Sequence, residues 1–290
     1  MPDLGKIATE AKVRVEKARA SYGLVDIAVR TFKRFSEDDG GFYAAALTYY
    51  VFFSIFPILI FATAVLGFVT NQYPEIEADL LEESFESFPL INTIIDEEVL
   101  VSVQRAAGRL ALLSIVLALY SGTGAVVALG HALNKIHRVE NEGNFFEKRL
   151  GALKWLALFS GAVIGSLVVT SVGAWAPDAI AALIGFAAGL GLNVGIFLTA
   201  YKFLPHFPRT WADVLPGALI AGGVFEVLKW FGTLYLDRGA AARSATFGAF
   251  ATAAGLLVAS YLLAQVTLLA AEVNAVLAER RLTRQSLTTG

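Results

Sequence analysis

Cysteine is missing from this chain of 290 residues, and only three histidines are present. The lack of cysteine excludes disulfides, thiolate metal sites and cysteine nucleophiles, and it leaves the redox compartment undefined. His131 and His137 are six residues apart, whereas two ligands on one helix face are three or four apart, and His206 is remote from both in sequence. No catalytic motif is apparent either. We therefore expect no metal, no cofactor and no enzymatic activity.

Charged residues are also scarce, at 17%, and the net charge is −2. A soluble domain usually carries about 25% charged residues. Because a basic face is needed to hold phosphates, nucleic acid is not an expected partner. Hydrophobic residues make up 56% of the chain, and the mean hydropathy is +0.63. This balance favours a membrane protein, with membrane lipids as expected partners.

Six apolar segments reach the length of about 20 residues that crosses a hydrocarbon core of about 30 Å. We expect an all-α fold with six transmembrane helices, a cytoplasmic amphipathic segment at 1–42, a transmembrane domain at 43–278 and a cytoplasmic tail at 279–290. A partly helical external loop with nine acidic residues would join the first two spans, over residues 71–106. The predicted spans are 43–70, 110–133, 155–176, 179–204, 214–236 and 247–271.

The distribution of lysine and arginine predicts the orientation, because basic residues are retained on the cytoplasmic side. Eighteen of them lie in residues 1–42, 134–154, 202–213 and after residue 271, against four in the intervening connections. Both termini are therefore expected in the cytoplasm.

An amphipathic helix is predicted within residues 11–37, where apolar side chains recur at helical spacing among basic ones. Two interpretations are open. The helix could lie on the inner leaflet, with its basic residues on anionic lipid, or it could pack as a solvated helix against other cytoplasmic segments. The apolar residues of the pattern are Leu24, Ile27, Ala28, Phe32 and Phe35.

Ionised side chains inside a span are costly, so they usually face a bundle interior or a water-filled cavity. Glu226 lies near the centre of the predicted fifth span, and Lys229 follows it by three residues, within pairing distance on one helix. The two could form an ion pair that fixes helix packing, or they could line a substrate or ion path. Glycines at four-residue spacing, Gly161/Gly165, Gly185/Gly189 and Gly191/Gly195, predict close helix packing.

Four stretches together resemble the YihY/BrkB family of bacterial inner-membrane proteins, formerly labelled ribonuclease BN. They are "AAALTYYVFFSIFPILI" (44–60), "LYSGTGAVVALGHALNKIHRVE" (119–140), "YKFLPHFPRTWADVLPGALIAGGVFEVLKWFGTLYL" (201–236) and "ATFGAFATAAGLLVASYLLAQVTLLAAEVNAV" (245–276). The positions that match the family pattern are Ala46, Tyr49, Tyr50, Ser54, Pro57, Leu133, Asn134, Tyr201, Pro205, Trp211, Asp213, Pro216, Gly217, Glu272 and Asn274. The chain departs from the pattern at Thr246–Gly248, at "VASY" (258–261) and at Ala270.

The resemblance implies a multi-pass protein of the bacterial cytoplasmic (inner) membrane that transports or exports a small solute, ion or lipid-like substrate. The alternative is a non-transporting structural or envelope-assembly protein, and ribonuclease activity is not expected. Candidates for a polar path are Glu226, Lys229, Tyr49, Tyr50, Ser54, Gln265, Glu272 and Asn274. Candidates for a structural hinge or helix cap are Pro57, Asp213, Pro216 and Gly217, because proline frees a backbone carbonyl and a carboxylate can cap a helix start.

Overall fold

The computed structural model describes residues 23–55, 107–139, 144–173, 178–239 and 245–288. Within these ranges the chain is helical and contains no strand. A helix of 16 residues, Gly40–Ile55, follows α2 after a short turn. The other described helices are α2 (Gly23–Glu37), α7 (Ala107–Ile136), α8 (Phe145–Gly173), α9 (Asp178–Phe203), α10 (Trp211–Gly239) and α11 (Ala245–Thr288).

Four of these helices contain a segment long and apolar enough to cross a membrane. The segments are Val116–Ile136 in α7, Leu183–Phe203 in α9, Trp211–Lys229 in α10 and Ala253–Thr283 in α11. The prediction of an all-α membrane protein is therefore confirmed. Helix α8 overlaps the predicted third span, and Gly40–Ile55 overlaps the first part of the predicted first span. Pro57 and the predicted external loop lie outside the described residues.

Two helix boundaries differ from the sequence prediction for physical reasons. Helix α10 begins at Trp211 rather than 214, because Thr210 and Asp213 form a capping box: the Thr210 backbone N–H donates to the Asp213 carboxylate over 3.1 Å. Helix α11 does not end near 271 but continues to Thr288. Residues 272–288 lack glycine and proline and are rich in alanine, leucine, glutamate and arginine, which favour helix. Most of the predicted cytoplasmic tail is thus an extension of the last helix.

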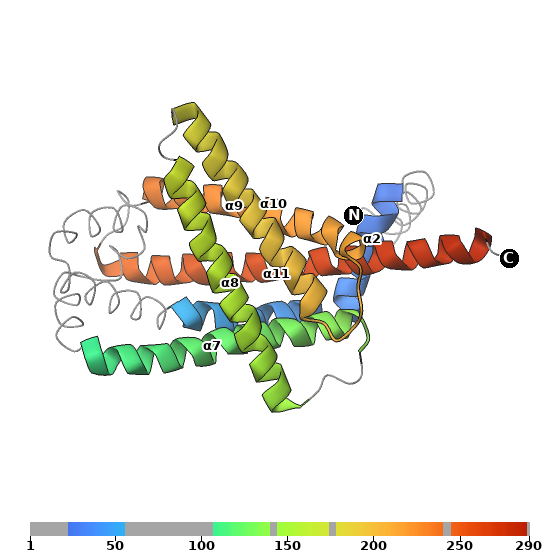
Figure 1. Ribbon diagram of the computed structural model, residues 1–290, viewed down its shortest axis with the longest axis horizontal. Coiled ribbons are helices and arrows are strands. Elements are labelled where there is room, and N and C mark those ends of the chain that lie inside the picture. Colours follow the sequence, from blue (N-terminus) through green and yellow to red (C-terminus); the bar gives the residue numbers. More distant parts are fainter. Residues whose placement is uncertain (1–22, 56–106, 140–143, 174–177, 240–244, 289–290) are drawn as a thin grey trace, which may run out of the picture.

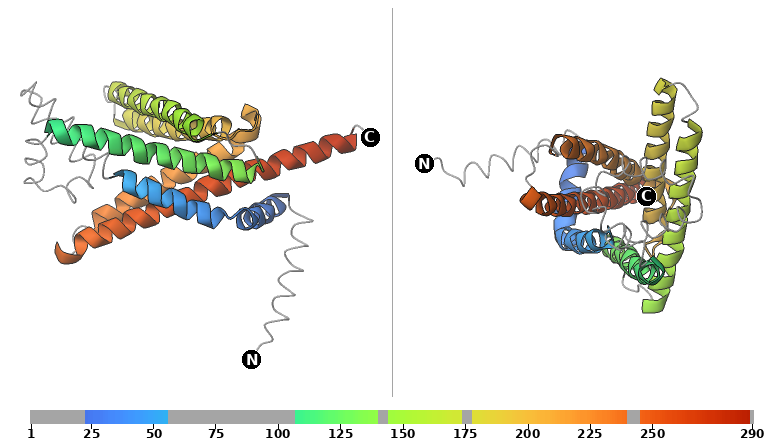
Figure 2. Two further views of the ribbon diagram at one scale, coloured as in Figure 1. Left: turned by 90° about the horizontal axis from the view of Figure 1, so that it is seen from below. Right: turned by 90° about the vertical axis from the view of Figure 1, so that its left-hand side faces the viewer.

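Helix α11 runs through the middle of the molecule (Figure 1). Helices α7 and Gly40–Ile55 lie along one side of it and α10 along the other, while α8 and α9 form a hairpin that crosses this group obliquely (Figures 1 and 2). Helix α10 packs against both α9 and α11, and α2 packs against α11. The C-terminal ends of α7 and α11 and the start of α10 lie at the same end of the molecule, beside α2.

The core lies where α7, α9, α10 and α11 meet, and it is centred on Leu133, Tyr201, Val214 and Leu268. Tyr201 is 2% exposed and donates its hydroxyl to the Thr267 carbonyl over 2.7 Å, which joins α9 to α11. A buried tyrosine needs such a partner, because an unpaired hydroxyl in an apolar environment costs free energy.

Of the described glycines in the predicted four-residue pairs, Gly189 makes a close helix contact, because an added Cβ would lie 3.2 Å from Glu226 Oε1. At Gly161, Gly185, Gly191 and Gly195 an added Cβ would meet no atom within 4 Å, so the packing prediction is wrong at these positions. Tighter approaches occur at glycines outside the pairs, at Gly124 on Tyr50, at Gly222 on Val194, and at Gly217 on Ala270 and Asn274. The spacing alone could not identify which face of each helix meets a neighbour.

Candidate functional site

Glu226 and Lys229 pair with each other near the middle of α10. The Lys229 ammonium lies 2.8 Å from Glu226 Oε2, and Asn193 of α9 donates its amide to Glu226 Oε1 over 2.6 Å. The Glu226 side chain is 14% exposed and that of Lys229 is 46% exposed. A Cβ added to Gly189 of α9 would lie 3.2 Å from Glu226 Oε1. These contacts hold α10 against α9, as the packing interpretation of the pair expects.

Asn274 connects α11 to the first turns of α10. Its Oδ1 accepts the backbone N–H of Gly217 over 2.7 Å, and its amide donates to the Val214 carbonyl over 3.2 Å. A Cβ at Gly217 would lie 2.4 Å from the Ala270 carbonyl oxygen, so only glycine permits this approach. Asn274 therefore bonds to backbone groups of α10 and forms a packing contact between the two helices.

Pro216 and Asp213 are stabilised by the last helix as well. Pro216 has no N–H, which removes the usual donor to the carbonyl of Ala212 four residues earlier. Arg281 of α11 donates to that carbonyl over 3.4 Å and to the Asp213 carboxylate over 3.0 Å. These two positions, like Gly217, thus have local structural contacts at the start of α10.

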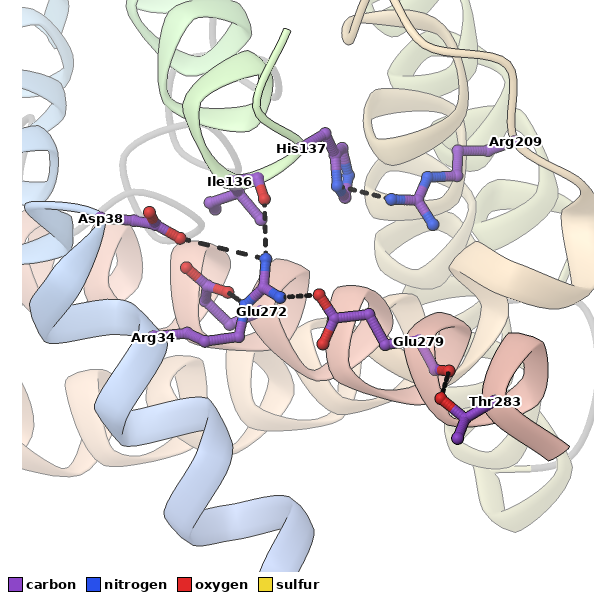
Figure 3. A network of polar contacts seen from close by, with 8 residues as sticks. All are labelled: Arg34, Asp38, Ile136, His137, Arg209, Glu272, Glu279 and Thr283. Carbon is purple, nitrogen blue, oxygen red and sulfur yellow. Dashed lines mark hydrogen bonds and ion pairs between the residues drawn. The ribbon is translucent and has the colours of Figure 1, made fainter. Parts of the chain in front are cut away.

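A network of polar contacts surrounds Arg34 of α2 (Figure 3). The Arg34 Nε lies 3.0 Å from Glu272 Oε2 on α11, and Nη2 donates to the Ile136 carbonyl at the end of α7 over 2.9 Å. Nη1 forms an ion pair with Glu279, which follows Glu272 further along α11. The Asp38 Oδ2 atom lies 4.0 Å from Nη2. One guanidinium therefore joins three helices and faces three carboxylates.

Burial differs sharply among these carboxylates. The Glu272 side chain is 1% exposed and that of Asp38 12%, whereas that of Glu279 is 55% exposed. Glu272 Oε1 and Asp38 Oδ2 are both buried without a hydrogen-bond partner among the described residues. The buried part of the cluster thus contains two carboxylates for one cation. We call Arg34, Asp38 and Glu272 the Arg34 cluster.

His137 and Arg209 lie beside the Arg34 cluster (Figure 3). Arg209 Nη2 lies 2.6 Å from His137 Nδ1, so that nitrogen accepts and the imidazole is neutral. Burial lowers the pKa of His137 to about 3, and the positive charges of Arg209 and Arg34 contribute to the shift. Nearby, Asn134 accepts the His206 backbone N–H over 2.8 Å, which joins α7 to the segment after α9.

The path candidates on the helix Gly40–Ile55 are separate from the Arg34 cluster. Tyr49 is 58% exposed and contacts the rings of Tyr50 and Phe53. Tyr50 packs on Gly124, and Ser54 donates to the Val51 carbonyl of its own helix over 2.7 Å. Gln265 is half-buried on α11. Of the predicted candidates, the structure brings only Glu272 into the Arg34 cluster.

Sequence reasoning missed Arg34, Asp38 and Glu279. Arg34 belongs to the basic face of an amphipathic helix, which is typical of a cation on lipid or in solvent. Its spacing of four residues from Asp38 was the one available signal, because such a pair shares a helix face. Among the described residues, no three His, Cys, Asp or Glu side chains converge in a way that could hold a metal ion.

Comparison with known proteins identifies the family of this chain. The family described as "Virulence factor BrkB" matches residues 31–289, and the chain belongs to this family of bacterial inner-membrane proteins. No solved structure matches the chain.

Three curated relatives illustrate the range of names in the family. The chain is 27% identical to "Inner membrane protein YhjD" of Escherichia coli (strain K12), over 84% of this chain and 78% of the relative. It is 27% identical to a "UPF0761 membrane protein" of Albidiferax ferrireducens, over 84% of this chain and 60% of the relative. It is 24% identical to "Putative ribonuclease-like protein YfkH" of Bacillus subtilis (strain 168), over 86% of this chain and 94% of the relative.

Proposed function

We propose that this inner-membrane protein is a transporter or exporter of a small solute, ion or lipid-like substrate, and that it is not an enzyme. The observation that carries the proposal is the Arg34 cluster. Two buried carboxylates share one guanidinium there, and each has an oxygen without a hydrogen-bond partner in the described residues. Glu272 belongs to the apolar segment Ala253–Thr283, where an ionised residue is expected to have a functional reason.

The charge balance of the cluster distinguishes it from a simple structural ion pair. Burying a charge costs free energy unless pairing and hydrogen bonds satisfy it. The pair Glu226–Lys229 meets that condition, since Asn193 supplies a further hydrogen bond. The Arg34 cluster has one negative charge in excess, which a proton or a cation would neutralise. Reversible occupancy of such a position is what a coupled transporter requires.

The orientation and span number are part of the proposal: six transmembrane helices, with both termini in the cytoplasm. The ends of the helices that carry most described basic residues gather beside α2 (Figure 1). The positive-inside rule assigns that end to the cytoplasm. The basic residues there include Arg30, Lys33, Arg34, Lys135, Arg138, Lys202, Arg209, Arg280 and Arg281.

The proposal can be tested with purified protein in liposomes. Currents on a solid-supported membrane would be recorded for small organic anions, organic cations, inorganic ions and lysophospholipids, with protein-free liposomes as the baseline. We expect at least one class to be moved by the natural protein, a strong loss in Glu272→Gln, and near-normal currents in Glu279→Gln. Glu279 is the matched control because it binds the same arginine but is largely exposed. Equal currents in both variants, or none above baseline in the natural protein, would refute the proposal.

The alternative, a non-transporting structural or envelope-assembly protein, is favoured by one observation on α2. Its buried residues are the polar Asp26 and Thr31, and Asp26 pairs with Arg280 of α11. Leu24 and Phe32 are instead 81% and 64% exposed. The helix thus buries the polar Asp26 and Thr31, packs Phe35 against the core and leaves Leu24 and Phe32 exposed, which combines features of both sequence interpretations. If Leu24→Ser with Phe32→Ser abolishes cellular function while Glu272→Gln does not, the alternative is preferred.

A further inference from the structure

Asp38 and Glu272 of the Arg34 cluster face each other through oxygens that lack a donor. Glu272 Oε2 accepts from Arg34 Nε over 3.0 Å, which leaves Oε1, and Asp38 Oδ2 lies too far from Arg34 Nη2 for a hydrogen bond. Both remaining oxygens are buried without a partner among the described residues. Figure 3 shows the two carboxyl groups on the same side of the guanidinium, within reach of one hydrogen bond. We call them the Asp38–Glu272 pair.

One proton would satisfy this pair. Two ionised carboxylates repel each other and cannot form a hydrogen bond, because each is an acceptor only. Carboxylates that share a buried site therefore favour a state in which one of them is protonated, as in the catalytic dyad of aspartic proteases. The added proton makes one carboxyl group a donor to the other. It also reduces the two negative charges of the pair to one, which the Arg34 guanidinium balances.

The groups on neighbouring elements do not balance the second charge. From α7, the Ile136 carbonyl and the neutral His137 add no positive charge. Arg209, from the segment after α9, donates to His137. From α11, Glu279 brings a further carboxylate to Arg34. Among the described residues, Arg34 is thus the cation that forms ion pairs with both members of the pair.

The pair suits a proton better than a metal cation. Hard cations take about six oxygen ligands. The pair offers two free oxygens, and the Ile136 carbonyl beside it already accepts from Arg34. In the part of the chain that the structure describes, no group of three possible metal ligands converges. The Asp38 side chain is 12% exposed and that of Glu272 1%, so a proton from solvent reaches the pair through Asp38.

Asp38 also lies at the joint between α2 and the helix Gly40–Ile55. Its backbone N–H donates to the Arg34 carbonyl over 2.7 Å at the end of α2. Asp39 follows with a φ of 57°, a left-handed conformation that aspartate tolerates, and its carbonyl accepts backbone N–H groups of the next helix. A proton between Asp38 and Glu272 would therefore join this turn to α11, and its loss would make the two carboxylates repel.

We propose that Asp38 and Glu272 share one proton at neutral pH, and that this proton is the ion exchanged during transport. The shared proton rests on the geometry of the pair, whereas its exchange during transport rests on the proposed function. Uptake forms one O–H bond on one carboxyl group and a hydrogen bond to the other. Release breaks the O–H bond and returns the proton to water through Asp38.

Infrared spectroscopy of the full-length protein in liposomes tests the shared proton. A protonated carboxyl group absorbs at a different frequency from a carboxylate, and its band shifts in D₂O. We expect such a band at neutral pH in the natural protein and its loss at alkaline pH. Asp38→Asn and Glu272→Gln should both lack the band, because the new amide is the donor and one carboxylate remains for one guanidinium, whereas Glu279→Gln should keep it. A band that is absent from the natural protein, or that both variants retain, would overturn the proposal.

Thermal stability gives a second readout that does not need the Glu272 variant to fold. With its shared proton, the folded protein holds one proton more than the unfolded chain, so its Tm should fall as the pH rises above neutral, more steeply than that of Asp38→Asn. Equal pH dependence would contradict the shared proton. Stabilisation by sodium chloride but not by choline chloride, absent in Asp38→Asn, would assign the position to a metal cation and overturn the proposal.

A pH gradient tests the exchange. In liposomes with equal substrate on both sides, an imposed pH gradient should drive current in the natural protein and in Glu279→Gln, but not in Asp38→Asn. Substrate currents that ignore the pH gradient would exclude the proton as the driving ion while transport itself stands. The infrared band without any substrate current would support the shared proton and refute the proposed function.

Discussion

Replacement of Gly217 by alanine should separate α10 from α11. The added Cβ would lie 2.4 Å from the Ala270 carbonyl oxygen and 2.4 Å from Asn274 Nδ2. The carbonyl is part of the α11 backbone and cannot rotate away. The two helices must therefore move apart, which also disturbs the 2.7 Å hydrogen bond from Gly217 N–H to Asn274 Oδ1.

The size of the effect follows from three contributions. Overpacking costs about 1–3 kcal/mol, and loss of the hydrogen bond costs about 0.5–1.5 kcal/mol. Alanine recovers about 0.5–1 kcal/mol, because glycine disfavours a helix interior. We expect the free energy of unfolding to fall by about 0.5–4 kcal/mol, with a Tm lower by about 2–4 °C for each kcal/mol.

The measurement is thermal unfolding of the purified protein in detergent, with Gly223→Ala as the matched control. Gly223 is on the same helix, and an added Cβ there meets no atom within 4 Å, so this variant should be as stable as the natural protein or slightly more stable. Gly222→Ala repeats the test against α9, where the new Cβ would lie 2.9 Å from the Val194 backbone nitrogen. If Gly217→Ala and Gly223→Ala unfold at the same temperature, the close α10–α11 contact is wrong.

Three further predictions concern charged groups and can be measured as thermal stability in detergent. Arg34→Met leaves Glu272 buried without its cation and should cost about 3–5 kcal/mol, and adding Glu272→Met should recover most of this; a purely additive double variant would contradict the pairing. Glu226→Gln should cost less than about 1 kcal/mol, because the side-chain oxygen that accepts from Asn193 remains, whereas Glu226→Leu should cost about 1–3 kcal/mol. The folded pKa of His137, about 3, is below its unfolded value near 6.5, so its contribution to stability is complete above pH 6.5 and is lost as the pH falls towards 3. The natural protein should therefore lose more stability than His137→Asn between pH 7 and pH 5, and equal losses would contradict a buried neutral imidazole.

The helical membrane architecture could be predicted from the sequence because it depends on long-range composition. Runs of about 20 apolar residues have few structural solutions in a bilayer. Helix ends were less predictable, since they depend on local contacts. The contact between Thr210 and Asp213 places the start of α10 at Trp211, earlier than predicted. Because residues 272–288 contain no glycine or proline, α11 extends beyond its predicted end.

The candidate site was harder to predict because it is built from residues far apart in sequence. Glu226 and Lys229 stood out as charges in an apolar run, and they pair with each other on α10. The spacing could not show that Asn193 of α9 also donates to Glu226. The Arg34 cluster depends on α2 crossing α11, which brings together residues 238 positions apart. The periodicity of α2 could identify its apolar positions, but it could not show that Asp26 and Thr31 are buried while Leu24 and Phe32 are exposed.

The central claim, that the protein is a transporter or exporter, implies a polar path between its helices and is tested most directly by cysteine accessibility, since the chain has no cysteine to remove. Ser54→Cys on the first helix and Gln265→Cys on α11 would be treated in intact cells and in inverted vesicles with a membrane-impermeant thiol reagent. The control is Val258→Cys, at an exposed position of the apolar segment of α11. Thiols react as thiolates, which form in water and not in lipid. The transport account predicts labelling at residues 54 and 265 from at least one side, and none at residue 258. No labelling at either position from both sides would indicate a sealed, dry bundle and contradict the account.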